Sequence, residues 1–294
     1  MLLPIALPLL LILSGCAPEP EHLVLSSDNV VISCHVQGTG KPVLVFVHGW
    51  CCDKNYWKLQ VPYFAKRHKV VTIDLAGHGD SGSDRQAWTI KAFSKDVVAV
   101  VEKLDLDQVI LIGHSMGGAV IIEAARQMPK RVIGLVGVDT YLDLERQYTR
   151  EQIEERLARF RANFAESTGK LVRSLFLPNA DPVLVEWIVT DMSSARPEAG
   201  IGAMQGYLSF DAKEALKEVR VPIYCINSDM RPTNVEAGRR YALSFEVKLM
   251  SEVGHFVMLE DAETFNQLLT ETIDELGRRT SGAIGSVKNL SHIL

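Results

Sequence analysis

The sequence contains no apolar run long enough to cross a membrane as a helix, and no cluster of basic side chains. The apolar stretch at residues 2–13 falls short of the ~20 residues that a spanning helix needs, and Pro4 and Pro8 interrupt it. Lysine and arginine number 31 against 36 aspartates and glutamates, a formal net charge of -5. These absences argue against a spanning helix and against a nucleic-acid-binding surface.

Nucleotide-binding glycine motifs and metal-binding cysteine motifs are also missing. There is no G-x-G-x-x-G, no P-loop and no C-x-x-C or Cys/His spacing, so we predict neither a cofactor nor a metal site. Beyond Cys16, the spacing of the cysteines fixes no disulfide pairing among Cys34, Cys51, Cys52 and Cys225. Cys34 and Cys225 lie in strand-like apolar runs, where free buried thiols are expected.

The N-terminal apolar run ends at Leu13-Ser14-Gly15-Cys16, which resembles the lipobox of bacterial lipoproteins. The resemblance implies a signal peptide at residues 1–15, a lipid on Cys16 and a tether over residues 16–27. Ala17 favours the outer membrane, facing the periplasm. The run departs from an ordinary signal because the first lysine or arginine is Lys41. The alternative is a buried N-terminal strand or helix of a cytosolic protein.

Short apolar strands alternate with helical segments over most of the chain. Strands are predicted at residues 30–36, 43–47, 70–73, 109–112, 132–138, 221–226 and 246–250. Helices are predicted at residues 55–67, 89–104, 117–128, 233–243 and 262–276. Strands that are apolar throughout and alternate with helices imply a mostly parallel sheet covered on both faces. The predicted fold is therefore α/β, with a core of residues 28–140 and 218–276.

The alternation stops between residues 141 and 217, where no strand is evident. Residues 150–164 carry an apolar stripe at helical spacing, and residues 183–192 form a second apolar segment. We therefore predict an inserted helical cap over the sheet at residues 141–217. The last segment, residues 277–294, is rich in glycine and serine and is expected to form a flexible tail.

The strongest motif is Gly113-His114-Ser115-Met116-Gly117, which matches G-x-S-x-G between a predicted strand and a predicted helix. In that setting the serine lies on a sharp turn, and its hydroxyl projects at a helix N-terminus, where developing negative charge is favoured. Ser115 is thus the candidate nucleophile. The alternative is a tight turn whose serine only caps the helix.

A serine nucleophile needs a base and an acid that orients the base. Of the eight histidines, His255 alone follows the last predicted strand apart from the tail, and Gly254 before it allows the loop to turn. Asp229, after the strand that follows the cap, is the favoured acid. It lies two positions after Asn227, at the end of that strand, whereas three positions is the usual spacing for such an acid. Asp139, after the preceding strand, is the alternative acid.

Acyl transfer also requires backbone N–H donors for an oxyanion. Met116, directly after Ser115, and Trp50, in the loop after the strand at 43–47, are the candidates. His48 is expected to brace that loop rather than to act as a second base. The substrate pocket is predicted to be mostly apolar with few charges, and to include Tyr141, Trp187, Met204 and Phe256.

These motifs together resemble the capped α/β-hydrolase family, over about residues 28–276. They are HGW at 48–50, DLAGHGDSG at 74–82, GHSMGG at 113–118, Asp229 and GHF at 254–256. The family includes carboxylesterases and haloperoxidase-like enzymes, and its epoxide hydrolases and haloalkane dehalogenases carry Asp where this chain has Ser115. The resemblance implies a serine hydrolase of a small or medium apolar carboxylic ester that needs no cofactor. The alternatives are a thioesterase, an amidase, a carbon–carbon bond hydrolase, or a ligand-binding protein with slow turnover.

Overall fold

The computed structural model describes residues 21–290, with side chains to residue 279. The predictions for residues 1–15 and for Cys16 lie outside this range. The described chain forms an eight-stranded sheet in the order β1-β2-β4-β3-β5-β6-β7-β8, in which β2 pairs antiparallel with β1 and β4 and all other pairs are parallel. The strands are β1 (His22–Leu25), β2 (Val31–Gln37), β3 (Val43–Val47), β4 (Val70–Ile73), β5 (Val109–His114), β6 (Val132–Val138), β7 (Ile223–Ser228) and β8 (Phe245–Met250).

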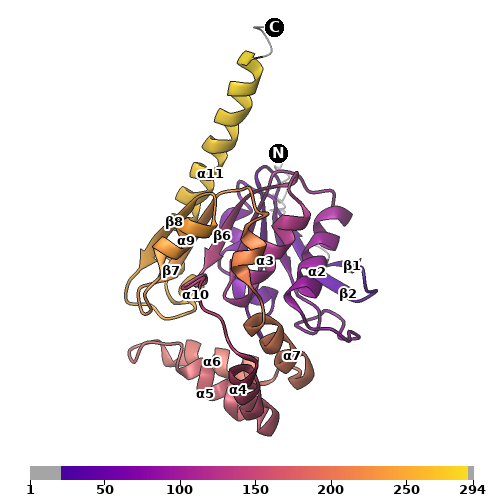
Figure 1. The fold of residues 1–294 in the computed structure, drawn as a ribbon, viewed down its shortest axis with the longest axis vertical. Coiled ribbons are helices and arrows are strands. Elements are labelled where there is room, and N and C mark those ends of the chain that lie inside the picture. Colours follow the sequence, from indigo (N-terminus) through magenta and orange to yellow (C-terminus); the bar gives the residue numbers. More distant parts are fainter. Residues whose placement is uncertain (1–20, 291–294) are drawn as a thin grey trace, which may run out of the picture.

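Helices cover both faces of this sheet (Figure 1). On β6, a side chain at Gly134 would meet Leu276 of one helix layer, whereas Gly137 faces Tyr141, which bonds to the other layer. Positions three apart on a strand point to opposite faces, so the two layers lie on opposite sides. The core helices are η1 (Lys54–Trp57), α1 (Val61–Phe64), α2 (Ile90–Lys103), α3 (Met116–Gln127), α9 (Val235–Tyr241), α10 (Val257–Glu260) and α11 (Ala262–Leu290).

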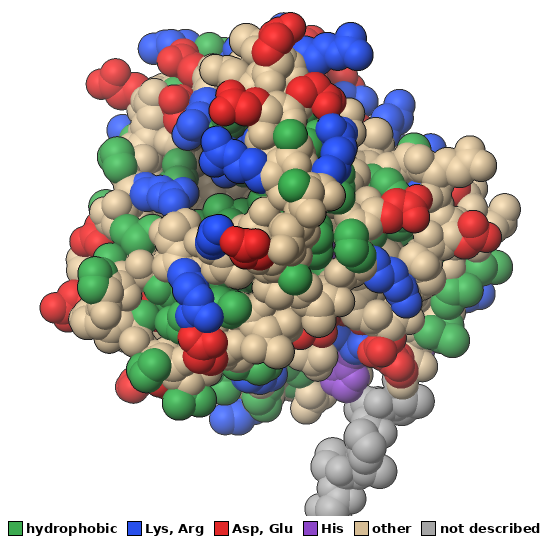
Figure 2. All heavy atoms as spheres, turned by 90° about the horizontal axis from the view of Figure 1, so that it is seen from below, with side chains coloured by type: hydrophobic (Ala, Val, Ile, Leu, Met, Phe, Trp, Pro, Cys, Tyr) green, Lys and Arg blue, Asp and Glu red, His purple; other side chains and the backbone are tan. Residues whose placement is uncertain are grey.

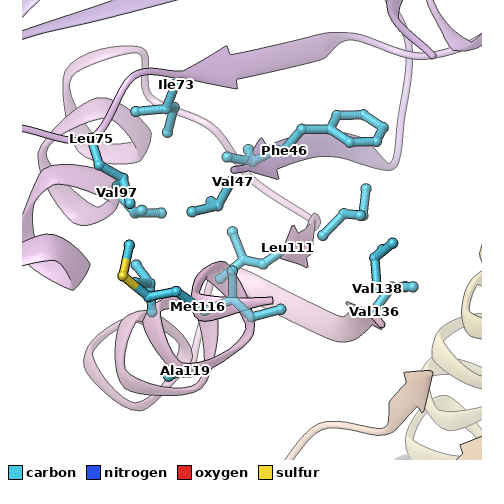
Figure 3. Close-up of a cluster of buried hydrophobic side chains, with 14 of the residues drawn as sticks. Phe46, Val47, Ile73, Leu75, Val97, Leu111, Met116, Ala119, Val136 and Val138 are labelled. Atoms are coloured by element: carbon cyan, nitrogen blue, oxygen red, sulfur yellow. The ribbon is translucent and has the colours of Figure 1, made fainter. Parts of the chain in front are cut away.

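The central strands are buried on both faces, as their continuous apolar sequences predict. Every residue of β3 and of β5 is buried. Figure 3 shows Val47 of β3 and Leu111 of β5 on the side of Val97 of α2 and Met116 of α3, whereas Phe46 of β3 points away from them and packs on Trp57. The α/β fold class and the mostly parallel sheet are thereby confirmed.

The segment between β6 and β7 is helical and forms a cap. Figure 1 shows helices of this segment as a layer at one end of the core. Thr149 and Gln152 form a capping box that begins the first of them. The cap helices are α4 (Arg150–Ala162), α5 (Phe164–Arg173), α6 (Pro182–Ser193), α7 (Pro197–Leu208) and α8 (Ala212–Leu216).

Two helix predictions differ from the structure. The single helix expected at residues 55–67 is divided into η1 and α1, because Pro62 has no N–H to continue a helix and its ring clashes with the preceding turn. The helix expected to end at residue 276 continues as α11 to Leu290, through the segment predicted as a flexible tail. Gly277, Gly282 and Gly285 are spaced along this stretch, and each costs a helix only about 1 kcal/mol without ending it.

The loop that follows β4 is organised around the buried carboxylate of Asp74. This carboxylate accepts the backbone N–H groups of Lys54 (2.6 Å) and Asp80 (2.9 Å) and forms an ion pair with Lys54 Nζ at 2.7 Å. Gly79 has a φ of 48°, and a side chain there would lie 2.4 Å from the carboxylate. The glycines of DLAGHGDSG therefore allow the chain to close around Asp74.

Two further features concern the described part of the chain. Cys34, Cys51, Cys52 and Cys225 are all free and buried, as expected for Cys34 and Cys225. Within residues 21–290, no helix is both long enough and apolar enough to cross a membrane.

Buried histidines connect the loops at the carboxyl ends of the strands. His48 donates from Nδ1 to the carbonyl of Gly49 at 2.7 Å, and its Nε2 accepts the N–H of Leu75 at 3.0 Å. It therefore braces the loop, as predicted. Burial lowers the pKa of His48 to about 4, and burial with the neighbouring His48 lowers the pKa of His78 to about 3.

These lowered pKa values predict acid destabilisation. Below about pH 6.5 these histidines become protonated in the unfolded chain but stay neutral in the folded protein. The free energy of unfolding therefore falls as the pH falls from 6.5 towards 4. Urea unfolding at pH 7 and at pH 4.5 should show a loss of roughly 2 to 3 kcal/mol for each histidine. In His78→Gln, the loss of unfolding free energy between the two pH values should be smaller by the contribution of one histidine. An unchanged loss would show that His78 does not have the lowered pKa.

Candidate active site

Ser115 lies on a strained turn between β5 and α3. Its φ of 52° and ψ of -116° place a non-glycine residue in a region that costs free energy. Its N–H donates to Val138 O at 3.0 Å, and Thr140 Oγ1 donates to its carbonyl at 2.9 Å. Although Ser115 occupies the N-cap position of α3, its side chain makes no capping hydrogen bond. The hydroxyl is therefore available to a ligand.

The two glycines of the motif let three segments meet at this turn. A side chain at Gly113 would lie 2.4 Å from the carbonyl oxygen of Gly117. A side chain at Gly117 would lie 2.6 Å from the carbonyl oxygens of both Val47 and His48. The motif thus holds the β5–α3 turn against the loop after β3, which carries Trp50.

His255 is bound to a buried carboxylate. Its Nδ1 lies 2.5 Å from Asp139 Oδ2, and the other carboxylate oxygen of Asp139 accepts the N–H of Ser228 at 2.8 Å. Asp139 follows β6 directly and is only 5% exposed. Ser115, Asp139 and His255 all line one cavity of about 410 Å³. Within residues 21–290 no hydrogen bond joins Ser115 Oγ to His255; such bonds commonly tighten only when substrate binds.

The structure thus pairs His255 with the alternative acid, and the preference for Asp229 is wrong. The N–H of Asp229 continues the sheet ladder to Met250 O at 3.0 Å, and its exposed carboxylate accepts Ser251 Oγ–H at 2.5 Å. Successive residues of a strand direct their N–H groups to opposite neighbours, so the N–H of Ser228 reaches Asp139 after β6 and the N–H of Asp229 reaches β8. The side chain of Asp229 is exposed and bonds Ser251.

The loop that carries His255 is fixed on both sides, by a residue that sequence reasoning missed. The carboxylate of Glu260 accepts the N–H of Gly254 at 2.8 Å and that of Phe256 at 2.9 Å. Burial raises the pKa of Glu260, which these two N–H donors oppose. The N–H of His255 donates to Leu175 O of the cap at 2.9 Å. The available signal was an acidic residue in the short apolar segment after His255.

His114 supports the same loop from the side of the nucleophile. Burial lowers the pKa of His114 well below its ordinary value, so the ring is neutral. Its Nε2 lies 3.0 Å from the carbonyl oxygen of His255, a geometry that requires the proton on Nε2. His114 therefore positions the backbone of His255.

The two predicted oxyanion donors lie at the same end of the cavity. Trp50 and Met116 both line it, and among the backbone hydrogen bonds of residues 21–290 none uses either N–H. The Met116 N–H is the first of α3, where the helix supplies no acceptor. The Trp50 indole is held by a 2.6 Å hydrogen bond to Gly200 O of the cap.

The predicted pocket residues are divided. Tyr141, Met204 and Phe256 line the cavity, but Trp187 does not. Trp187 packs on Tyr56 with ring centroids 5.1 Å apart, under the ammonium group of Lys58. Met192, on the same helix α6, does line the cavity. Trp187 and Met192 are five positions apart, so their side chains point in different directions around the helix.

The cavity is more highly charged than predicted. Apolar side chains from the sheet and the cap line it, but so do three arginines, Arg146, Arg156 and Arg231. The expectation of few charges is therefore wrong. The hydrophobic pattern of the cap gave no sign of these residues, because they lie at polar positions of α4 and of two loops.

Fold and site together define a serine hydrolase-type arrangement: a strained serine turn, a histidine–carboxylate pair and free backbone donors around one cavity. Residues 44–268 match the family model described as the Alpha/beta hydrolase family. The chain belongs to this family.

Individual relatives carry different names. The dihydrolipoyllysine-residue acetyltransferase component of the acetoin cleaving system of Pseudomonas putida is 29% identical over 78% of this chain, which spans 63% of that protein. The Karrikin insensitive 2 receptor CA of Petunia hybrida is 24% identical over 66% of this chain and 75% of its own length. A thermophilic esterase from Thermogutta terrifontis superposes with a TM-score of 0.75 at 23% identity, over 87% of this chain and 99% of its own.

The two aspartates are separable by experiment. We expect Asp139→Asn to lower the rate at which a fluorophosphonate labels Ser115 by about 10³- to 10⁴-fold, because His255 loses the carboxylate that sets its tautomer. The matched variant Asp229→Asn should label within about twofold of the parent, since its carboxylate contacts only Ser251. Equal losses in the two folded variants would reject Asp139 as the orienting acid.

Proposed function

We propose that the protein hydrolyses carboxylic esters through a covalent acyl-enzyme formed on Ser115. One observation carries the proposal: Ser115, on its strained turn, and the His255–Asp139 pair open onto the same cavity of about 410 Å³. A cavity of that size suits a small or medium substrate. The structural likeness to an esterase concerns the fold and raises no claim about substrate.

In the first half-reaction, Ser115 Oγ attacks the ester carbonyl carbon while His255 Nε2 takes the hydroxyl proton. Asp139 accepts the Nδ1–H hydrogen bond and stabilises the imidazolium that forms. The carbonyl oxygen becomes an oxyanion, and we assign its binding to the N–H groups of Trp50 and Met116, two residues that line the cavity. His255 then gives the proton to the leaving alcohol oxygen, and the ester C–O bond breaks.

In the second half-reaction, water replaces the alcohol. His255 takes a proton from the water as its oxygen attacks the acyl carbon, and the same N–H donors bind the second oxyanion. Return of the proton to Ser115 Oγ breaks the acyl–serine bond and releases the carboxylic acid. The enzyme ends unchanged, and no further reactant is consumed.

Removal of the nucleophile tests this proposal. Ser115→Ala should lower kcat/KM for 4-nitrophenyl butyrate by about 10³-fold or more and abolish covalent labelling by a fluorophosphonate, with an unchanged melting temperature. The matched control Ser83→Ala, in a different loop, should keep both activities. Labelling that persists in Ser115→Ala would place the nucleophile elsewhere.

A second candidate is a ligand receptor that hydrolyses its ligand slowly; the Petunia relative is named a receptor. Repeated turnover separates the two functions. An enzyme releases many equivalents of product for each Ser115, whereas a single-turnover receptor stops at one. Thioester, amide and carbon–carbon substrates would use the same serine, and relative kcat/KM values distinguish them.

We also propose that the chain is anchored to a bacterial envelope membrane by a lipid on Cys16. The proposal rests on the sequence Leu13-Ser14-Gly15-Cys16 alone.

Fractionation of cells that express the full chain tests this anchor. Cys16→Ser should move the protein from the membrane pellet to the soluble fraction, because it removes the thiol that the lipid would occupy. Cys34→Ser, at a buried strand position, serves as the control and should stay with the membrane. A Cys16→Ser protein that remains in the pellet would refute lipid anchoring.

A further inference from the structure

Three arginines from separate elements converge on the cavity that holds Ser115. Arg146 lies in the connection from β6 to α4, Arg156 lies on α4, and Arg231 lies in the loop between β7 and α9. Arg146 and Arg231 are exposed and Arg156 is half-buried, which places them towards the opening. Figure 2 views the molecule from the cap side and shows a hollow with hydrophobic side chains inside it and Lys or Arg side chains around it.

These guanidinium groups have no carboxylate partner within the described chain. Several other arginines of the described chain do form ion pairs, for example Arg85 with Asp96 and Arg131 with Asp105 at 3.1 Å. No ion pair of residues 21–290 includes Arg146, Arg156 or Arg231. Their donors are thus free for an anion that enters the cavity.

Two carboxylates share the opening, but both are already occupied. Asp143 accepts the N–H of Glu145 at 3.0 Å. Asp211 accepts the amide of Gln147 at 2.9 Å and the N–H of Lys213, where it caps α8. Apart from Asp139, which is buried against His255, the cavity lining carries three guanidinium groups and two carboxylates, an excess of one positive charge that a single negative charge would match.

The three arginines line the same cavity of about 410 Å³ as Ser115 and His255, so one small molecule in it can contact both groups of residues. Tyr207 also lines the cavity, and burial raises its pKa; Arg156 and Arg146 act to lower it, and Asp139 acts to raise it. The Tyr207 hydroxyl is therefore within electrostatic reach of Arg146, Arg156 and Asp139. Apolar residues such as Met204 and Phe256 line the cavity as well.

We propose that Arg146, Arg156 and Arg231 bind a carboxylate of the substrate, so that the preferred substrates are monoanionic esters with an apolar spacer between that carboxylate and the ester. The planar guanidinium matches the two oxygens of a carboxylate. The proposal rests on the proposed ester hydrolysis, and it replaces the uncharged substrate expected from the sequence.

A pair of isosteric substrates tests the charge. Mono-4-nitrophenyl adipate carries a carboxylate where 4-nitrophenyl adipamate carries a neutral amide, and both release 4-nitrophenol. We expect kcat/KM to favour the adipate by about tenfold or more, after subtraction of spontaneous hydrolysis. Equal values, or a preference for the amide, would overturn the proposal.

Variants assign that preference to the arginines. Arg156→Gln and Arg231→Gln should each lower the adipate-to-adipamate ratio of kcat/KM by about five- to tenfold, mainly through KM for the adipate. The control Arg159→Gln lies on the same helix but pairs with Glu155 in solvent, and it should keep the parent ratio. Two arginine variants are used because Arg231, in an exposed loop, has little influence on folding. A parent ratio in both folded variants would refute the assignment.

Binding without turnover separates this proposal from ester hydrolysis itself. Calorimetry on Ser115→Ala should show monomethyl adipate binding about tenfold more tightly than methyl adipamate, whether or not the parent enzyme cleaves esters. Tight binding without cleavage would reject the proposed function and retain the anion site. Cleavage of esters without a preference for the carboxylate would retain the proposed function and reject the anion site. If inorganic phosphate competed for the arginines more strongly than monomethyl adipate does, a site for a single carboxylate would be rejected.

Discussion

The structure depends on the contact of three backbone segments at the Ser115 turn. Gly113, Gly117 and the carbonyls at the end of β3 approach too closely for any side chain to separate them. That contact holds Ser115 at a positive φ, which an unsupported serine would leave. The same contact sets the loop of Trp50 beside the first turn of α3, so the positions of Ser115 and of the two candidate oxyanion donors depend on one backbone contact. The strain is maintained by the buried sheet on which all three segments rest.

Much of this arrangement could be predicted from the sequence, because local signals and the fold agree. The strands β3 and β5 are buried on both faces, so their sequences are apolar throughout and are easily recognised. The serine motif combines a strand end, two obligatory glycines and a helix start within five residues. His255 was found by its position after the last strand. In each case the information lies within a short stretch of chain.

What could not be predicted depends on direction and on distant contacts. The choice between Asp139 and Asp229 turns on which side of β7 a residue faces, and one position in register reverses it. Glu260 was missed because its partners are backbone N–H groups, which leave no mark on the sequence. The charged opening of the cavity was missed because its arginines come from three elements that only the tertiary structure brings together.

The cap has a consequence that concerns how such proteins diversify. Its Leu175 carbonyl holds the backbone of His255, and its Gly200 carbonyl holds the indole of Trp50. An exchanged or shortened cap therefore alters the base and the oxyanion loop as well as the shape of the cavity. The shape of the cavity and the support of the candidate site are therefore linked in this chain: evolution or engineering that remodels the cap must rebuild the hydrogen bonds to His255 and Trp50 at the same time.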